Sequence, residues 1–241
     1  MENWSWLLDQ SASTVGPQLD RLYYWILVIT GIVFVVTEVA LIWFLIKYRH
    51  REGHKAAFIH GNTKAEIIWT VIPAVIVLSI ALASRGLWAQ VKDPEEFPPN
   101  AMPVLITAKQ FEWNVTYPGP DGEIGTGDDF RSRNRLDIPL DRPTRLALHS
   151  EDVIHSFFVP LFRLKQDVVP GMETHMWFQP TRTGEFPIGC AELCGIGHTR
   201  MRGTLTVHSP ADYQAWVNEQ VGAAAPAAVD SAAPAPATQA Q

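Results

Sequence analysis

Two uninterrupted apolar runs near the start of the chain constrain the fold more than any other feature of the sequence. The first extends from Leu22 to Ile46 and the second from Ile67 to Trp88. Each has about the 20 residues that an α-helix needs to cross a membrane, and a helix of a soluble protein rarely lacks a polar face for so long. Tryptophans, whose amphipathic rings favour the membrane interface, lie near all four ends: Trp25, Trp43, Trp69 and Trp88. We therefore predict two transmembrane helices.

The loop between the two runs predicts their orientation. From Lys47 to Lys64 five lysines and arginines stand against a single acid, Glu52. By the positive-inside rule, such a basic loop is cytoplasmic. The first run is too long for a cleaved signal peptide, and acidic residues precede it. We expect residues 22–90 to form a hairpin with a cytoplasmic loop at 47–66 and both chain termini on the outer face.

Charge separates the hairpin from the rest of the chain. Through Gln90 the sequence has six acidic and seven basic residues, whereas the remainder has nineteen acidic and twelve basic residues. The remainder therefore carries a net charge of −7, which argues against a nucleic-acid partner and favours a basic or metal-containing one.

Short runs rich in Val, Leu, Thr and aromatic residues follow the hairpin, separated by clusters of Gly, Pro and Asp. This pattern predicts an antiparallel β-sandwich or barrel. A helix is expected to start at Ser209, Pro210 and Asp212, which resemble a helix N-terminus. The predicted strand runs lie at 104–118, 144–150, 155–160, 175–180 and 203–209.

Three other segments complete the expected organisation. An external segment, 1–21, precedes the hairpin, and the external domain spans 91–221. Within that domain, the turn-rich stretch 118–130 carries aspartates that could bind calcium, although solvated hairpin loops commonly have this composition. Residues 222–241 are almost entirely Ala, Pro, Gln, Ser and Thr, so we predict a disordered tail.

Both cysteines of the chain lie in one stretch, CAELCGIGHTRM, at 190–201. Cys190 and Cys194 can aim their sulfurs at a common point, while His198 and Met201 add an imidazole and a thioether. These ligands suit copper better than magnesium, calcium or manganese. A blue-copper centre uses one cysteine, so the second thiolate favours two coppers bridged by both sulfurs, each capped by one histidine.

The second capping histidine is expected from a different part of the external domain. Residue chemistry alone places His155, just after a predicted strand, only slightly ahead of His149. Two other interpretations of the cysteines stay open at this point: a small disulfide, or a zinc site that would gain little from Met201. The candidate histidines are His149, His155, His175 and His208.

Three motifs resemble subunit II of haem–copper cytochrome c oxidases: SEDVIHSFFVP, LKQDVVPGM and GCAELCGIGHTRM. The similarity extends from the first predicted membrane helix, through AEIIWTVIPAVI, to about residue 218. It implies a two-helix anchor and an external cupredoxin-like Greek-key barrel that holds a dinuclear copper centre, CuA. The implied ligands are bridging Cys190 and Cys194, with His155 and Met201 on one copper, and His198 and the backbone carbonyl of Glu192 on the other.

The same resemblance implies function and partners. CuA would accept electrons from cytochrome c, or from a dedicated c-type cytochrome, and pass them to haem a of subunit I. Haem a3 and CuB of subunit I would then reduce O2 to water, coupled to proton pumping. The side chain of Glu192 would reach a Mg or Mn ion shared with subunit I. Other oxidase subunits and membrane lipid complete the expected partners, in a bacterial inner membrane with both termini periplasmic.

Two other classes of protein use similar ligands. A membrane-anchored copper carrier or assembly factor would bind copper only to deliver it. Nitrous oxide reductase carries a similar dicopper motif, but it is soluble and much longer, so the hairpin argues against it. The sequence contains no C-x-x-C-H motif, so no c-type haem is expected on this chain.

Two acidic residues near or within the membrane carry further expectations. Glu66 opens the second apolar helix, where the helix dipole favours an acid, and the resemblance matches it to the acid at the mouth of the K proton channel. Glu38 lies inside the first helix. Because an ionised carboxylate in hydrocarbon is costly, we expect Glu38 to face subunit I.

Electron transfer into the domain is expected near Phe111. The sequence Gln110-Phe111-Glu112-Trp113 departs from the family's Gln-Trp-x-Trp, so Phe111 replaces the surface tryptophan that receives the electron. We expect Trp113 to act mainly through folding of the copper domain. Acidic side chains are expected around Phe111 to steer a basic donor: Asp121, Glu123, Asp128, Asp129 and Asp152.

Overall fold

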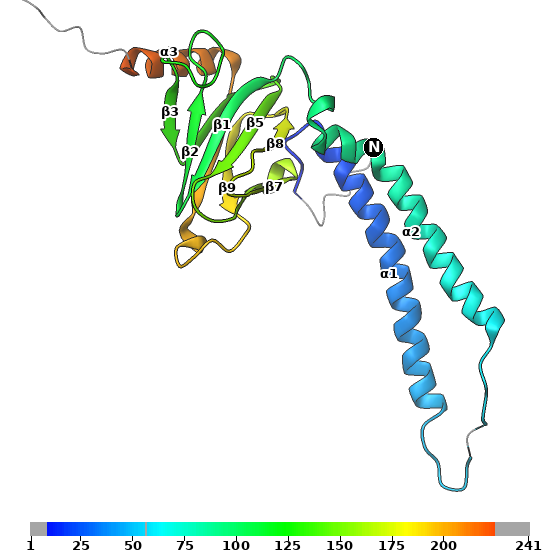
Figure 1. The fold of residues 1–241 in the computed structure, drawn as a ribbon. Helices are drawn as coiled ribbons and strands as arrows, with labels where there is room; N and C mark the ends of the chain where they lie inside the picture. The colour runs from blue at the N-terminus through cyan, green and yellow to red at the C-terminus, as the bar shows by residue number, and fades with distance from the viewer. Residues whose placement is uncertain (1–8, 56, 225–241) are drawn as a thin grey trace, which may run out of the picture.

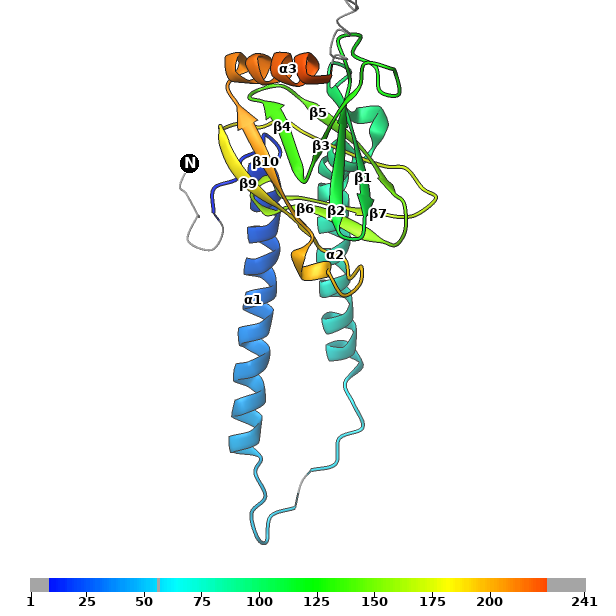
Figure 2. The ribbon, with the colours of Figure 1, turned by 90° about the vertical axis from the view of Figure 1, so that its left-hand side faces the viewer.

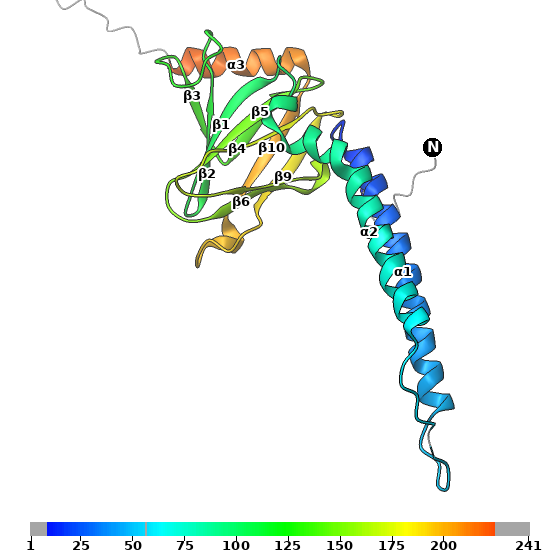
Figure 3. The same cartoon turned by 45° about the vertical axis from the view of Figure 1, so that its right-hand side comes forward.

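The computed structural model describes residues 9–55 and 57–224. In this part of the chain, two long helices form a hairpin, α1 (Gly16–Lys47) and α2 (Thr63–Lys92). Both descend from the same side of the molecule (Figures 1 and 3), and they separate toward the loop that joins them (Figures 1 and 2). Both are long and apolar enough to cross a membrane, as predicted. Asn62 caps α2, because its side chain accepts a hydrogen bond from the Ala65 N–H at 3.2 Å. Large apolar side chains cover the hairpin surface, as expected where lipid or other helices surround it.

An all-β domain follows the short helix η1 (Pro94–Glu96), as predicted. The described residues after α2 form ten strands in two five-stranded sheets. The first sheet has the order β3-β2-β1-β5-β8, and the second has the order β4-β10-β9-β6-β7. The bounds are β1 (Met102–Lys109), β2 (Glu112–Tyr117), β3 (Phe130–Arg133), β4 (Arg135–Pro139), β5 (Thr144–Ser150), β6 (His155–Val159), β7 (Leu164–Val168), β8 (Thr174–Phe178), β9 (Gly184–Cys190) and β10 (Arg202–His208).

The strand pairing corrects two predictions. The wholly antiparallel arrangement is wrong for β1–β5 and β4–β10, which pair parallel. Between β1 and β5 the chain crosses to the second sheet to form β4, and this long connection lets β5 return in the direction of β1. The predicted run 104–118 is two strands, because the chain reverses at Gln110 and Phe111 and Lys109 pairs with Glu112.

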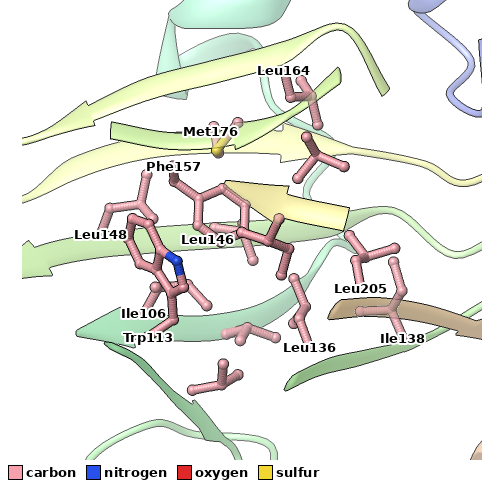
Figure 4. Packing of buried hydrophobic residues seen from close by; sticks show 14 of the residues in the cluster. Ile106, Trp113, Leu136, Ile138, Leu146, Leu148, Phe157, Leu164, Met176 and Leu205 are labelled. Atoms are coloured by element: carbon pink, nitrogen blue, oxygen red, sulfur yellow. The ribbon is translucent and has the colours of Figure 1, made fainter. Parts of the chain in front are cut away.

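The core lies between the two sheets. Along β1 the side chains alternate, with Met102, Val104, Ile106 and Ala108 buried, as the two-residue period of a strand requires. Figure 4 shows Trp113 of β2 facing Phe157 of β6 inside this core. Their ring centroids lie 5.3 Å apart in an edge-to-face arrangement, which aromatic pairs prefer.

The helix α3 (Pro210–Ala224) covers one end of the domain. It begins where predicted, with the Ser209 hydroxyl accepting a hydrogen bond from the Asp212 N–H at 3.2 Å. Trp216 of α3 packs edge-on against Tyr117, with centroids 5.1 Å apart. Of the predicted disordered tail, residues 222–224 end α3 and residues 225–241 lie outside the described residues, as do residues 1–8 of the predicted N-terminal segment.

The two ends of the β-domain carry different loops. The loop 118–129 lies beside α3, whereas the loop between β9 and β10 lies at the opposite end, toward the side on which the hairpin descends (Figures 1 and 2). The latter loop contains the short helix η3 (His198–Arg200). The sulfur-rich stretch of the sequence is therefore at the end of the domain remote from α3.

Candidate metal centre

Three elements converge at the end of the domain remote from α3. β6 begins at His155, β9 ends at Cys190, and the loop 191–201 returns the chain to β10. β6 and β9 are neighbours in the second sheet, where Phe157 pairs with Cys190. Sheet pairing therefore brings His155 close to the cysteine loop, although 35 residues separate it from Cys190.

The predicted ligands gather around a pair of sulfur atoms. The free thiols of Cys190 and Cys194 lie 3.8 Å apart. The Cys190 sulfur is 4.0 Å from His155 Nδ1 and 3.2 Å from the carbonyl oxygen of Glu192. The Cys194 sulfur is 3.6 Å from His198 Nδ1 and 3.8 Å from the Met201 sulfur. These six donor atoms form what we call the sulfur cluster.

His155 is the histidine that the fold selects for this cluster. Among the described residues, His155, Cys190 and Cys194 are the group of His, Cys, Asp and Glu whose ligand atoms all lie within 4.8 Å of one another. The other candidates have different surroundings. His208 contacts Asp137 at 2.6 Å, His175 contacts Glu173 at 3.4 Å, and His149 lies on β5 in the other sheet.

One side of the cluster is buried, whereas Cys190 and His198 are half-buried and Glu192 is exposed. His155 is fully buried, and Cys194 and Met201 are buried nearly as completely. Burial, with a further contribution from Cys190, raises the pKa of the Cys194 thiol from 9.0 to about 11. This thiol is therefore neutral near pH 7 without a metal, and a bound cation would have to displace its proton.

Asp152 fixes the orientation of His155. The Asp152 carboxylate lies 2.8 Å from His155 Nε2 and also accepts hydrogen bonds from the N–H groups of Gln110, at 2.7 Å, and Val153, at 2.6 Å. Burial acts to raise the pKa of Asp152, but these hydrogen bonds outweigh it and the pKa lies below its usual value. An Nε2–H donated to a carboxylate leaves Nδ1 as a lone pair facing the sulfurs, which is how metal-binding histidines are commonly held.

The turn between β1 and β2 packs on the cysteine loop. The Gln110 side chain donates a hydrogen bond to the Cys194 carbonyl at 2.6 Å. The Phe111 ring lies so close to the loop that a Cβ at Gly197 would be 2.3 Å from its Cδ2 atom. Phe111 is half-buried, whereas Trp113 is fully buried and its ring centroid is 6.1 Å from that of His155. Gln110 was not predicted as a site residue, because its contact exists only once this turn folds onto the loop.

The structure corrects the predicted ring of acids around Phe111. Phe111 precedes one end of β2, while the loop 118–129 follows the other end, roughly 20 Å away along a six-residue strand. Asp152 does lie close to Phe111, but it holds His155. In the loop, the carboxylates of Asp121, Asp128 and Asp129 accept hydrogen bonds from the loop's own residues. The predicted acids that lie at the end of β2 remote from Phe111 are Asp121, Glu123, Asp128 and Asp129.

The remaining predicted residues lie elsewhere. The Glu192 side chain is exposed beside the sulfur cluster. Glu66 is exposed in the first turn of α2, at the end of the hairpin remote from the β-domain, and Glu38 is half-buried within α1.

Comparison with known proteins covers both parts of the chain. The sequence model for "Cytochrome C oxidase subunit II, periplasmic domain" matches residues 110–207, and the one for "Cytochrome C oxidase subunit II, transmembrane domain" matches residues 1–87. The chain is 34% identical over 222 residues to the alternative cytochrome c oxidase subunit 2 of Bradyrhizobium diazoefficiens, covering 83% of this chain and 78% of that protein. It is 31% identical over 262 residues to cytochrome c oxidase subunit 2 of Thermostichus vulcanus, covering 87% and 77%. The periplasmic domain of subunit II of cytochrome oxidase (CoxB) of Bradyrhizobium japonicum is 26% identical, with a TM-score of 0.47 over 53% of this chain and 99% of that one.

Proposed function

Because this chain belongs to the cytochrome c oxidase subunit II family, we propose that its sulfur cluster binds two copper ions as a CuA centre. The chain is a membrane subunit of a haem–copper oxidase, an oxidoreductase that works together with other oxidase subunits. In the proposal, this subunit receives electrons one at a time from a c-type cytochrome. It passes them to haem a of subunit I, where O2 is reduced at haem a3 and CuB.

One observation carries this proposal: four donor atoms surround two thiol sulfurs that lie 3.8 Å apart. Two four-coordinate metal ions that share both thiolates need four further donors, and the cluster offers that number. Cys190 and Cys194 would bridge, His155 and Met201 would complete one copper, and His198 with the Glu192 carbonyl would complete the other. Soft sulfur and imidazole ligands favour copper over hard cations.

The residues of this chain would prepare the site for electron transfer. A bound dinuclear copper centre supplies one-electron chemistry with its charge change spread over two metals. The buried side chains of His155, Cys194 and Met201 exclude water from one side of the cluster, and Asp152 holds His155 in one tautomer. Ligands held by strands and by a packed loop move little between redox states, so little reorganisation accompanies each transfer.

Phe111 is the proposed place where the electron arrives. Its half-buried ring packs directly on the cysteine loop. The ring can thus offer an apolar contact to a donor, and an electron that arrives there is next to the loop that carries the sulfur cluster. Trp113 supports the cluster from inside the core.

Three further roles belong to the proposal. The exposed side chain of Glu192 would reach a Mg or Mn ion shared with subunit I. Glu66 would lie at the mouth of a proton channel on the cytoplasmic side. The basic loop at 47–66 would be cytoplasmic and both termini periplasmic, as the positive-inside rule requires.

A copper carrier is the competing function, and burial argues against it. A carrier needs accessible ligands for release, whereas His155, Cys194 and Met201 are all buried. The test is to load the purified full chain with copper and measure stoichiometry, near-infrared absorption and loss of metal to a chelator. We expect two coppers per chain, a dicopper near-infrared band and slow loss. One copper per chain, released rapidly, would favour the carrier.

A further inference from the structure

The chain segment that precedes α1 is built into the β-domain. We call residues 9–15 the strap. Ala12 donates a backbone hydrogen bond to the Leu161 carbonyl at 2.7 Å and accepts one from the Thr181 N–H at 2.9 Å. The Ser13 hydroxyl donates to the Phe162 carbonyl at 2.8 Å. Ala12 and Ser13 are buried. The strap is therefore part of the β-domain, although the whole hairpin lies between the strap and the domain in the sequence.

An ion pair continues this attachment into α1. Arg163 donates to both carboxylate oxygens of Asp20, at 2.6 and 3.1 Å, and to the Pro160 carbonyl at 3.0 Å. Both side chains of the pair are largely buried, with 16% and 21% exposure. Arg163 also has a left-handed backbone, with φ of 60°, which is unfavourable for a residue with a Cβ. The hydrogen bonds to Asp20 and Pro160 hold the Arg163 side chain in place on this backbone conformation.

The end of α2 is attached to the same side of the domain. The Trp177 indole N–H donates to the Gln90 carbonyl at 2.6 Å. Val91 and Phe97 pack with Trp177 and with Val15 of the strap in a small apolar cluster separate from the main core. The Lys92 ammonium donates to the Gln166 side chain at 2.7 Å. Figure 1 shows this junction, with the dark blue strap between α1 and β8.

The two attachments differ in what they permit. The end of α2 is joined to the domain by the chain through η1 and by the contacts of Gln90, Val91 and Lys92, which all lie within one helical turn. The strap and the Asp20–Arg163 pair add a second attachment, from the other helix, and two helices attached to the domain restrict its tilting more than one does.

The second attachment holds the turn that follows the strand bearing His155. The short helix η2 (Pro160–Phe162) comes directly after β6, which starts at His155. Five strand residues span roughly 15 Å, so a tilt of about 10° at η2 would move the sulfur cluster by about 2–3 Å. Phe162 is fully buried and contacts Phe178 and Phe186, so the turn moves only with the domain.

We propose that Ser13, Asp20 and Arg163 are positioning residues that fix the sulfur cluster relative to the membrane helices. A haem in a partner subunit bound to these helices would then lie at a constant distance from the cluster. Electron tunnelling falls exponentially with distance, so this contact would set the rate of the outgoing transfer. The inference rests on the proposed electron-transfer function.

The test uses Asp20→Asn in the intact oxidase complex. One measurement is hydrogen exchange of the strap amides, Ala12 and Thr14, and of Thr181. The others are the rate at which the native c-type cytochrome reduces the copper, and the rate of the next transfer to haem a. We expect faster exchange confined to the strap, an unchanged copper spectrum and incoming rate, and a several-fold slower outgoing transfer.

Three variants make the result specific. Asp20→Glu keeps the carboxylate and should restore much of the outgoing rate, while Ser13→Ala should lower it by removing a second strap contact. Arg133→Gln is the matched control, because it breaks an ion pair with Glu112 that lies within the β-domain. It should leave the outgoing transfer rate unchanged.

The outcomes separate this inference from the proposed function. An unchanged outgoing rate in Asp20→Asn with released strap amides would overturn the positioning role. So would equal slowing of both transfers, or exchange that rises throughout β1 and β5, because these indicate a purely structural contact. Failure of the proposed function would instead appear in the wild-type protein, as a missing dicopper band.

Discussion

Replacing Asp152 by asparagine is the sharpest single perturbation of the proposed copper site. The carboxylate accepts three hydrogen bonds, from His155 Nε2 and from the N–H groups of Gln110 and Val153. Asparagine has the same size but only one acceptor oxygen. If that oxygen retains the hydrogen bonds from His155 and Val153, the NH2 group of the amide takes the position that faces the Gln110 N–H at 2.7 Å. Two hydrogen-bond donors then oppose each other.

The alternative amide orientation also harms the site. An N–H2 facing His155 favours the tautomer with the proton on Nδ1, the nitrogen that faces the Cys190 sulfur at 4.0 Å. Nδ1 must be unprotonated to bind a metal. Loss of such a supporting contact typically lowers metal affinity about 10- to 100-fold, which corresponds to ~1.4–2.7 kcal/mol of binding free energy.

The assay is a competition titration of the full chain in detergent, with a chromophoric copper chelator. Asp128→Asn is the matched control, since this exposed acid lies in the loop beside α3 at the other end of the domain. We expect Asp152→Asn to lose affinity by one to two orders of magnitude, and Asp128→Asn to match the wild type. Equal affinity for all three proteins would refute the role of Asp152 in orienting His155.

Three further predictions concern the electron donor, pH and the membrane helix. Phe111→Ala should slow copper reduction by the native c-type cytochrome in stopped flow, whereas Asp128→Asn should not; equal rates for Phe111→Ala and the wild type would exclude this arrival point. Because the pKa of Cys194 is raised to about 11, copper loading should release protons and the apparent affinity should rise from pH 6 to 9; a pH-independent affinity would contradict a displaced thiol proton. Glu66→Ala should slow turnover of the oxidase with its copper spectrum intact, and unchanged turnover would leave Glu66 as an ordinary helix-start acid.

Features that depend on local sequence could be predicted. The two membrane helices follow from apolar length, and the start of α3 follows from Ser209 and Asp212. The sulfur-rich loop was predictable because four candidate ligand side chains, two Cys, one His and one Met, lie within twelve residues. Local sequence could not decide between His155 and His149 as the second histidine, because that choice depends on β6 and β9 being neighbours in one sheet.

Features that depend on strand direction and pairing could not be predicted. β3, β4 and β7 are short and rich in charged residues, so they lack the apolar pattern of a strand. The acids of the loop 118–129 are close to Phe111 in sequence, but β2 carries them to the opposite end of the domain. Asp152 was expected to steer a donor, and its contact with His155 arises only from the fold of the segment before β6.

The electron paramagnetic resonance spectrum of the copper-loaded full chain tests the central claim most directly. One unpaired electron shared by two bridged coppers gives a seven-line hyperfine pattern. We predict this pattern for the wild type and its loss in Cys194→Ser, because a serine hydroxyl is too hard a ligand and too weak an acid to bridge copper. A four-line pattern from a single copper in the wild type, or a seven-line pattern that persists in Cys194→Ser, would contradict the proposed dinuclear centre.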